Sequence, residues 1–414
     1  MALDPEELKK QRVQKQQARE RKRKQTIIKL IVAACLLVVG AVAIIVVAST
    51  DKAPSSKPKD TISQEGATES APATTVVHLA AVGDLNVTED VVNSAGSDYD
   101  FTKTILDVAP ILAQADITAL NFEGCLYGEP YGTDRSAPQS LAQALSKAGV
   151  DLVQLANSYS IYKGMDGLVS TINGIRAAGM EPLGAYESTA AKQAKGYTIK
   201  NVQGVKIAFV AFTKGMDGMS LPAGNNGCVN LLYTDYSSDY QQINTEGIIQ
   251  ILDATAKEKP DITVALLHWG SEFNDTVSSS QEEICTLLQD NGVNAIIGTH
   301  SHYVQKMTFD EEKGNFIAYS LGDFLGDAKR SGSEYSVVLD LEITKDLSSG
   351  KAKITNFSYT PIFICNEKDS PLRVLRIKEA MAAYESGYIN RVTEDTYNKM
   401  EYALTRIEDR INGG

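Results

Sequence analysis

Short apolar runs rich in β-branched residues alternate with stretches of helical periodicity from Thr75 onward. The apolar runs predict strands at VVHLAAVGDLN, DITALNFEG, DLVQLANS, DITVALLHWG and NAIIGTH. The periodic stretches predict helices near residues 101–113, 140–148, 165–178, 245–257 and 281–289. The run GYTIKNVQGVKIAFVAFT predicts two strands joined at a Gln-Gly turn. Strands that alternate with helices indicate an α/β sandwich, and two late β pairs followed by helices indicate additional antiparallel pairing.

Polar side chains that can act as ligands stand where several of the predicted strands end. They are Asp84, Glu123, Asn157, His268 and the pair His300 and His302. The carboxyl ends of strands are where α/β sheets build their ligand sites. Three of the chain's four histidines occupy such positions, whereas His78 lies inside a predicted strand and is interpreted as structural.

The segment GTHSHY places two imidazoles one residue apart, just after an apolar run. An extended backbone would send His300 and His302 to the same face, so that both rings could reach one ion. Carboxylates and imidazoles together suit zinc, manganese or iron, and a pair of such ions can activate water and bind a phosphoryl group. The alternative is that these positions are polar simply because loops begin there.

The first 50 residues differ from the rest in charge and hydropathy. Residues 1–25 carry nine lysines and arginines against four acidic residues, whereas residues 30–48 carry no charge. About 20 apolar residues span a bilayer, and flanking positive charge stays in the cytoplasm. We therefore predict a basic cytoplasmic tail at 1–25 and a transmembrane anchor at 26–49. A cleaved secretory signal is the alternative, although no convincing small-residue cleavage site follows.

The segment after the predicted anchor has a different composition again. Residues 50–75 are rich in Ser, Thr, Pro, Ala and Lys, which predicts a disordered linker before a folded domain at 76–414. The anchor would hold this domain outside the cell, at the membrane. The tail carries a net charge of +5 and the whole chain −12, so the rest of the chain carries −17. So acidic a remainder argues against nucleic acid as a partner. The four cysteines beyond the anchor are too widely spaced for a disulfide framework or a metal finger, which predicts buried thiols.

Six sequence blocks occur in a familiar order: AVGDLN, ALNFEG, DLVQLANS, LLHWGSEF, IIGTHSHYVQ and YSLGDF. With them the chain resembles the CapA/PgsA family of poly-γ-glutamate capsule biosynthesis proteins over roughly residues 76–324. The resemblance implies a calcineurin-like metallophosphoesterase fold, a layered α/β/β/α sandwich that typically follows one N-terminal membrane span. Carried over position by position, it implies divalent-metal ligands at Asp84, Glu123, His268, His300 and His302. The sixth block usually reads Gly-Asn-Phe in the family, and Asp323 here keeps an oxygen ligand while adding a charge.

The third block departs from the family pattern. The family usually shows Ala-Asn-Asn-His and then an Asp, but here Asn157 is followed by Ser158 and Tyr159, and Tyr162 replaces the Asp. In related metallophosphoesterases the second Asn is a metal ligand and the His protonates or stabilises the transferring group. Serine is a weak metal ligand, and a tyrosine with a pKa near ~10 is a poor proton shuttle at neutral pH.

Site roles within this framework are assigned from the residues that match or replace the family's motifs. We assign catalysis to Tyr159 and His302. Substrate binding is assigned to Asn157, Glu272 and Trp269, the last of which follows His268 directly and could line a groove. Aromatic residues near strand ends also serve in packing, and that alternative stays open for Trp269.

Three functions are compatible with these features. The first is a role in the synthesis, export or attachment of poly-γ-glutamate or a similar anionic polymer, at the membrane and beside other capsule-synthesis subunits. The second is a metal-dependent hydrolase of the cell envelope that acts on a phosphoester or an amide. The third is a catalytically inactive scaffold of the same fold. Because an acidic body binds a polyanion badly, the first function would require a metal or a cationic groove.

Overall fold

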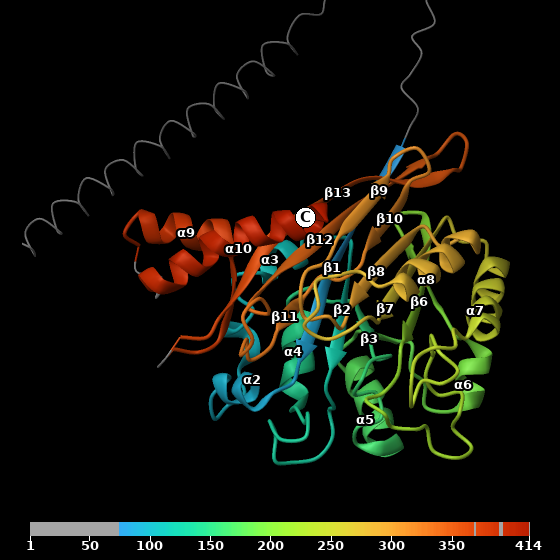
Figure 1. Ribbon diagram of the computed structural model, residues 1–414, viewed down its shortest axis with the longest axis horizontal. Helices are drawn as coiled ribbons and strands as arrows, with labels where there is room; N and C mark the ends of the chain where they lie inside the picture. Colours follow the sequence, from blue (N-terminus) through green and yellow to red (C-terminus); the bar gives the residue numbers. More distant parts are fainter. Residues whose placement is uncertain (1–73, 368–369, 389–391, 414) are drawn as a thin grey trace, which may run out of the picture. The chain divides into compact units, whose positions relative to one another are not determined.

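Two β-sheets pack face to face at the centre of this computed structural model, which describes residues 74–367, 370–388 and 392–413 (Figure 1). Helices cover the outer face of each sheet, so the described residues form an α/β/β/α sandwich. The predicted α/β class is therefore confirmed, and the late antiparallel pairs are present as expected.

The larger sheet contains eight strands in the order β14-β13-β12-β1-β2-β3-β4, with β11 pairing to β1 off this path. The first four strands in sequence, β1 to β4, run parallel to one another, whereas β12, β13 and β14 are antiparallel to their neighbours. The strand bounds are β1 (Thr74–Asn86), β2 (Ile117–Glu123), β3 (Leu152–Gln154), β4 (Glu181–Leu183), β11 (Asp323–Leu325), β12 (Tyr335–Asp346), β13 (Ala352–Cys365) and β14 (Arg373–Arg376).

The smaller sheet contains six strands in the order β5-β6-β7-β8-β10-β9. Its four inner strands are parallel, and the two edge strands β5 and β9 are antiparallel. The predicted turn between β5 and β6 is formed by Gln203 and Gly204, both at positive φ. The strand bounds are β5 (Thr198–Val202), β6 (Val205–Thr213), β7 (Ile262–His268), β8 (Ala295–Thr299), β9 (Met307–Asp310) and β10 (Asn315–Ala318).

The helices follow the strands in most of the predicted places. Those near the larger sheet are α2 (Glu89–Ser94), η1 (Phe101–Lys103), α3 (Ala109–Leu112), α4 (Gln139–Lys147), α5 (Gly164–Ala177), α9 (Ile377–Glu385) and α10 (Glu394–Asn412), and the remainder are α6 (Thr189–Ala194), α7 (Thr245–Lys257) and α8 (Ser279–Asp290). The single helix predicted near 101–113 is wrong. Two short pieces, η1 and α3, take its place, because Pro110 lacks an N–H and fits only the first turn of α3.

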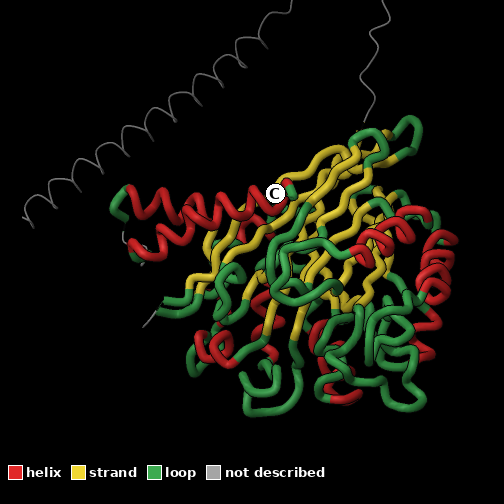
Figure 2. Tube along the Cα trace, viewed as in Figure 1, coloured by secondary structure: helices red, strands yellow, loops and turns green. Residues whose placement is uncertain are grey.

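Helices flank the strands of the sandwich (Figure 2). Three apolar layers hold these elements together. The first lies between the larger sheet and helices such as α4 and α5, and the third lies between the smaller sheet and α7 and α8. The second fills the space between the sheets with side chains such as Leu79, Phe209 and Leu339, all fully buried. Burying a side chain of this size contributes about 1.5–3 kcal/mol, so the inter-sheet layer dominates the adhesion of the two sheets.

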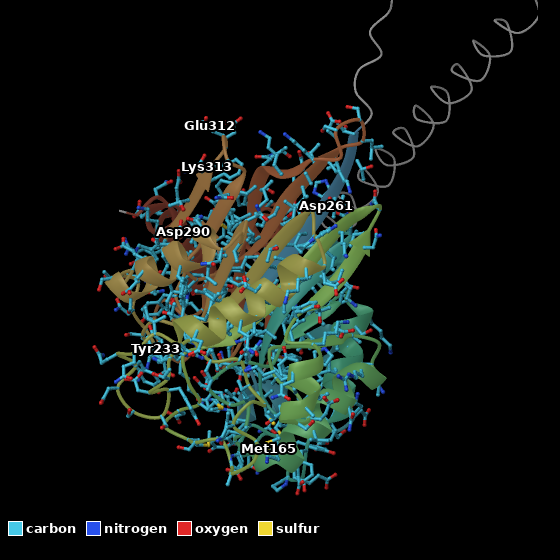
Figure 3. The ribbon with its side chains drawn as sticks, turned by 90° about the vertical axis from the view of Figure 1, so that its right-hand side faces the viewer. Met165, Tyr233, Asp261, Asp290, Glu312 and Lys313 are labelled. Carbon is cyan, nitrogen blue, oxygen red and sulfur yellow. The ribbon has the colours of Figure 1, made fainter. Side chains whose placement is uncertain are left out.

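Residues at opposite ends of the sandwich can be followed in a side view (Figure 3). The turn between β9 and β10, which carries Glu312 and Lys313, lies at one end, and Met165 in α5 lies at the other. Asp261, which precedes β7, lies away from Met165. The parallel strands of both sheets run toward the Met165 end, and there they deliver the candidate ligands described below.

The predicted tail, anchor and most of the linker, residues 1–73, lie outside the described residues. Within the described ranges, no helix combines the length and apolarity needed to cross a membrane. The predicted buried thiols are confirmed, since Cys125, Cys228, Cys285 and Cys365 are all free and buried. His78 lies within β1, and its Nδ1 pairs with Asp340 at 3.0 Å, which is consistent with a structural role.

Candidate metal centre and cleft

A β-bulge at Gly83 directs Asp84 toward the space between the sheets. In β1, Leu79 and Ala81 face the inter-sheet layer while Val82 faces the helices. Strict alternation would therefore point residue 84 toward the helices, but the register with β2 shifts between Val82 and Asp84. A Cβ on Gly83 would lie 1.7 Å from the Gly322 carbonyl oxygen, so only glycine allows this close approach. The bulge thus sets Asp84 on the same side as His268.

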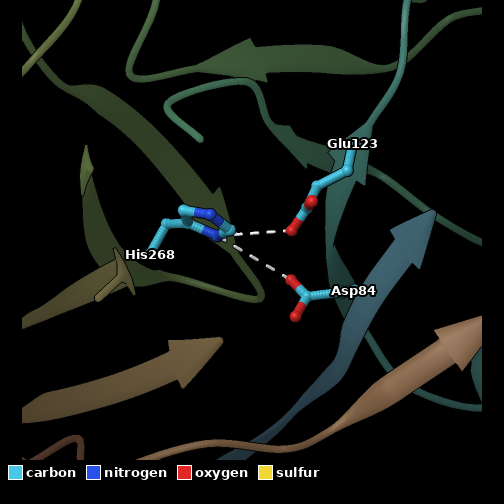
Figure 4. Close-up of side chains that lie close together, drawn as sticks. All are labelled: Asp84, Glu123 and His268. Atoms are coloured by element: carbon cyan, nitrogen blue, oxygen red, sulfur yellow. Dashed lines mark ion pairs between the residues drawn. The ribbon is translucent and has the colours of Figure 1, made fainter. Parts of the chain in front are cut away.

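The first group of candidate ligands consists of Asp84, Glu123 and His268 (Figure 4). All three are fully buried, and His268 Nδ1 lies 3.5 Å from Glu123 Oε1 and 3.9 Å from Asp84 Oδ1. The Asn121 amide nitrogen stands among them, 2.5 Å from Asp84 Oδ1, 3.2 Å from Glu123 Oε1 and 3.3 Å from His268 Nδ1. Asn121 therefore supplies the polar hydrogens that hold these carboxylates together.

The second group consists of Asp84, His302 and Asp323, so Asp84 belongs to both groups. Within each group the potential ligand atoms lie within 4.8 Å of one another. Asp84 and Asp323 are register partners in the parallel pair β1–β11, which explains why their carboxylates meet. His302 Nδ1 lies 2.7 Å from Asp323 Oδ1, and the same oxygen accepts a hydrogen bond from Asn86 Nδ2 at 3.0 Å.

His300 is the feature that most directly points to a missing partner. Both of its ring nitrogens are buried and lack a hydrogen-bond partner among the described residues, although its backbone N–H donates to Asp84 Oδ2 at 2.8 Å. A buried polar group without a partner is costly, so such groups are rare in native proteins. With carboxylate and imidazole donors around it, this orphaned ring fits a divalent cation.

The sequence argument that His300 and His302 lie on an extended backbone is wrong. β8 ends at Thr299, and the two histidines have φ values of 91° and 59°, so the chain turns sharply there. Their ring centroids are 6.3 Å apart, and His302 belongs to the second group while His300 belongs to neither. The pair therefore does not converge on one point in the predicted way.

The electrostatics of the cluster separate its histidines. Burial lowers the pKa of His268 and of His300 well below the ordinary value, so both imidazoles are neutral at pH 7. Burial also lowers the pKa of His302, but the charge and hydrogen bond of Asp323 outweigh it and raise that pKa to about 10. Burial raises the pKa of Asp323 to about 6 despite His302. Burial, reinforced by the charge of Asp84, raises the pKa of Glu123 well above its usual range.

The altered third block lies beside the first group. Ser158 Oγ is 3.0 Å from His268 Nε2, so this position contacts a candidate ligand even with serine present. The Asn157 amide donates to Asn121 Oδ1 and to the Phe122 carbonyl, and its oxygen accepts the Tyr159 N–H. Asn157 is thus a buried positioning residue that fixes the orientation of Asn121.

A cleft of about 280 Å³ opens beside the second group. It is lined by Asn86, Thr88, Arg135, Tyr159, Glu272, Phe273, His302, Asp323, Gly326, Asp327, Lys329, Arg330 and Ser333. Three site residues predicted from the sequence therefore line it, namely Tyr159, Glu272 and His302. Tyr159 receives a hydrogen bond from Arg135 Nη2 at 2.6 Å, and burial raises its pKa to about 12, so its hydroxyl stays protonated.

Trp269 does not line this cleft. Its side chain is 1% exposed, stacks on Tyr319 at 6.0 Å and donates its Nε1–H to the Tyr319 carbonyl at 2.9 Å. Strand alternation explains the difference, because His268 faces the inter-sheet side and the next residue points into the apolar layer under α8. The structure places Trp269 in the core rather than in the groove predicted from the sequence.

Replacing Trp269 with Ala should destabilise the protein by about 3–5 kcal/mol, the usual cost of removing a buried tryptophan side chain. Urea unfolding followed by circular dichroism measures this directly. Phe273→Ala is the matched control, because Phe273 is half-buried at the cleft and its truncation should cost about 1 kcal/mol. Equal unfolding midpoints for wild type and the Trp269 variant would contradict the core assignment.

Several residues of the site were missed from the sequence. Asn121 carried a signal, since it faces the same side of β2 as Glu123 two residues later. Asp323 was noticed as a change in the sixth block but was not placed among the ligands. Arg135 gave no signal, because it comes from the irregular loop between β2 and α4 and reaches Tyr159 only in the folded chain.

Comparisons with known proteins agree with this picture. The family model described as "Bacterial capsule synthesis protein PGA_cap" matches residues 78–328. The "Capsule biosynthesis protein CapA" of Bacillus anthracis is 27% identical over 263 residues, an alignment that covers 60% of this chain and 59% of that protein. The "PGA biosynthesis protein CapA" of Bacillus subtilis is 25% identical over 317 residues, covering 73% of this chain and 76% of that protein. The chain thus spans about three fifths of the length of the B. anthracis relative.

Among solved structures, the calcineurin-like phosphoesterase YfkN from Bacillus subtilis is similar at a TM-score of 0.45 and 15% identity, covering 80% of this chain and 100% of that one. The family match is the stronger finding, since it extends over more than half of the chain and contains every candidate ligand of both groups. The chain therefore belongs to the family of bacterial capsule synthesis proteins described as PGA_cap.

Proposed function

We propose that this protein acts in the synthesis, export or attachment of poly-γ-glutamate or a similar anionic polymer outside the cell. The observation that carries the proposal is the coincidence of the family match with the site. Residues 78–328 contain both groups of candidate ligands and ten of the thirteen residues that line the cleft. The relatives from B. anthracis and B. subtilis are named for capsule and PGA biosynthesis, which supports the same pathway for this chain.

The cleft supplies the cationic surface that an acidic body needs in order to bind a polyanion. Arg135 and Arg330 line it, and neither forms an ion pair within the described part of the chain. A local cluster of positive charge attracts an anionic chain even where the net charge of the protein is negative. This local positive charge would allow the acidic protein to bind a polyanionic ligand in the cleft.

The two ligand groups support a calcineurin-like metal centre as part of the proposed function. Asp84, Glu123 and His268 would hold one divalent ion and Asp84, His302 and Asp323 a second, with His300 as an additional donor. When bound, zinc, manganese or iron would polarise a phosphoryl or carbonyl oxygen and lower the pKa of water. The chain's own contribution is positional: Asn121 orients the carboxylates, and the Tyr159 hydroxyl can donate a hydrogen bond into the cleft while its oxygen accepts one from Arg135.

The proposed location is the cell membrane. The basic segment at 1–25 and the uncharged stretch at 30–48 support a single-pass anchor with its N-terminus in the cytoplasm and residues 76–414 outside. In this position the cleft would meet the polymer beside the membrane subunits that make or export it.

Deleting the gene in its host tests this function directly. We expect cell-associated γ-linked glutamate, measured by acid hydrolysis and amino-acid analysis, to fall at least about tenfold, since relatives named for this biosynthesis are similar to this chain in sequence. Re-expression of the wild-type chain should restore the polymer, whereas re-expression of Asp84→Asn should not. Unchanged polymer in the deletion strain would contradict the proposal.

A second candidate function is hydrolysis of a phosphoester or amide in the envelope. The specific observation in its favour is the sharing of Asp84 between two ligand groups, an arrangement that suits a pair of ions acting on one substrate. The third-block residues Ser158 and Tyr159 count against efficient catalysis, because neither is a good replacement for a metal-binding amide or a proton-transferring imidazole. If Ser158→Asn and Tyr159→His together produce no hydrolysis, the third function, a catalytically inactive scaffold, is favoured.

A further inference from the structure

Two arginines of the cleft are held against aromatic rings instead of carboxylates. The Arg135 guanidinium carbon lies 3.9 Å from the centre of the Tyr159 ring, and its Nη2 donates to the Tyr159 hydroxyl. The Arg330 guanidinium carbon lies 3.9 Å from the centre of the Phe273 ring. Within the described part of the chain, neither side chain forms an ion pair. Stacking on a ring leaves the N–H edges of a guanidinium free to bind an anion.

Both stacks stand directly beside the candidate metal centre. Phe273 also stacks on His302, with ring centroids 4.7 Å apart and planes 20° apart, so Arg330, Phe273 and His302 form one continuous stack. Tyr159 follows Ser158, whose hydroxyl contacts His268. An anionic group bound by either arginine would therefore lie next to the cluster.

The charges that line the cleft do not cancel. Lys329 is already paired with Asp90 at 3.2 Å and with Asp327 at 3.1 Å, and His302 is paired with Asp323. The remaining charged residues of the lining are Arg135, Arg330 and Glu272, which leaves two cations against one anion. The two unpaired cations come from different loops, one between β2 and α4 and the other between β11 and β12. Two separate anchoring points suit a ligand with two separate anionic groups better than a single small ion.

We propose that Arg135 and Arg330 form an anion clamp that binds two carboxylates of one polymer chain and lays the chain across the candidate metal centre. This inference rests on the proposed function and names its substrate class, a flexible polymer with repeated carboxylates. Each guanidinium presents a planar pair of N–H donors that matches a carboxylate. The aromatic ring beneath it fixes the direction of those donors and reduces the freedom lost on binding.

The test uses the full-length chain in detergent and a fluorescently labelled γ-linked oligoglutamate, with binding measured by fluorescence anisotropy after chelator treatment. Arg135→Gln and Arg330→Gln should each weaken binding about tenfold, and the double variant more than either. Lys329→Gln is the matched control: it removes the same charge from the same cleft, but Lys329 is already paired, so binding should change by no more than about twofold. Arg135→Lys should be intermediate, because it keeps the charge and loses the planar donor pair.

Several outcomes would overturn the clamp. Equal losses from all three glutamine variants would mean that only the overall charge matters, and unchanged binding in the arginine variants, with unchanged melting temperatures, would remove the clamp altogether. Inorganic polyphosphate that competes more strongly than unlabelled oligoglutamate would assign the site to a phosphate polymer instead. γ-Linked oligoglutamine, which lacks the charges, should not compete.

The clamp and the proposed function can fail separately. Loss of polymer in the deletion strain together with normal oligoglutamate binding by the arginine variants would reject the clamp and leave the function standing. Unchanged polymer in the deletion strain together with arginine-dependent binding would reject the function and leave the clamp standing.

Discussion

Replacing Asp84 with Asn should abolish divalent-metal binding by the full-length protein. Asp84 is the one residue common to both ligand groups, so its loss removes a negative oxygen donor from each of them at once. Asparagine keeps the shape of the side chain and replaces one acceptor oxygen with an amide nitrogen that cannot bind a cation. The metal content measured by elemental mass spectrometry should fall below about a tenth of the wild-type value, since losing even an outer-shell partner typically costs 10–100-fold in affinity.

The same variant should lose its stabilisation by metal. A ligand present at about 1,000 times its Kd stabilises the folded state by about 4 kcal/mol, so manganese should raise the melting temperature of the wild-type protein by several degrees. That increment should vanish in Asp84→Asn. Asp340→Asn is the control, because it neutralises a partly exposed carboxylate of β12 that belongs to neither group. Equal metal content or an equal increment in wild type and Asp84→Asn would show that Asp84 is not a ligand.

Restoring the family pattern with Ser158→Asn and Tyr159→His should raise metal-dependent hydrolysis of bis(p-nitrophenyl) phosphate by about 10² or more. A general acid or base contributes about 10²–10⁴ in rate, and Tyr159 cannot act as one near neutral pH because burial raises its pKa to about 12. Position 158 already touches His268, so an asparagine amide placed there reaches the candidate centre.

Three controls make the gain of hydrolysis interpretable. Each single variant should show a smaller gain than the double variant, and adding Asp84→Asn to the double variant should remove it. Metal content should be the same in the double variant and in wild type. If the double variant keeps its metal and its fold but gains no activity, the cleft has been adapted to something other than phosphoryl transfer, and the scaffold alternative is favoured.

Much of the fold could be predicted from the sequence because most of the longer parallel strands are short apolar runs followed by a helical period. The strands that carry Asp84, Glu123 and His268, and helix α7, lie where the pattern placed them. Strand-end positions also led to most of the ligands, since parallel strands converge at their carboxyl ends. Short elements such as β4 and α2 were missed because three to six residues show too little periodicity.

The finer geometry of the site depends on features that periodicity cannot show. The bulge at Gly83 reverses the facing of Asp84, and the turn after β8 separates His300 from His302. Asp323 joins the cluster only because β11 pairs with β1, a contact between residues more than 230 positions apart in the chain. Arg135 and Arg330 lie in irregular loops, and their positions against Tyr159 and Phe273 follow from tertiary contacts alone.

The most direct test of the Asp84-centred metal site is anomalous X-ray diffraction from crystals of the protein soaked in manganese. The arrangement of the ligands predicts an anomalous peak in each group, each within about 2.0–2.6 Å of an Asp84 oxygen. A single peak that lies away from both ligand groups would contradict the Asp84-centred metal site. The absence of any peak at a saturating manganese concentration would contradict it as well. In that case the buried carboxylates and histidines would have to be explained as a purely structural network organised by Asn121.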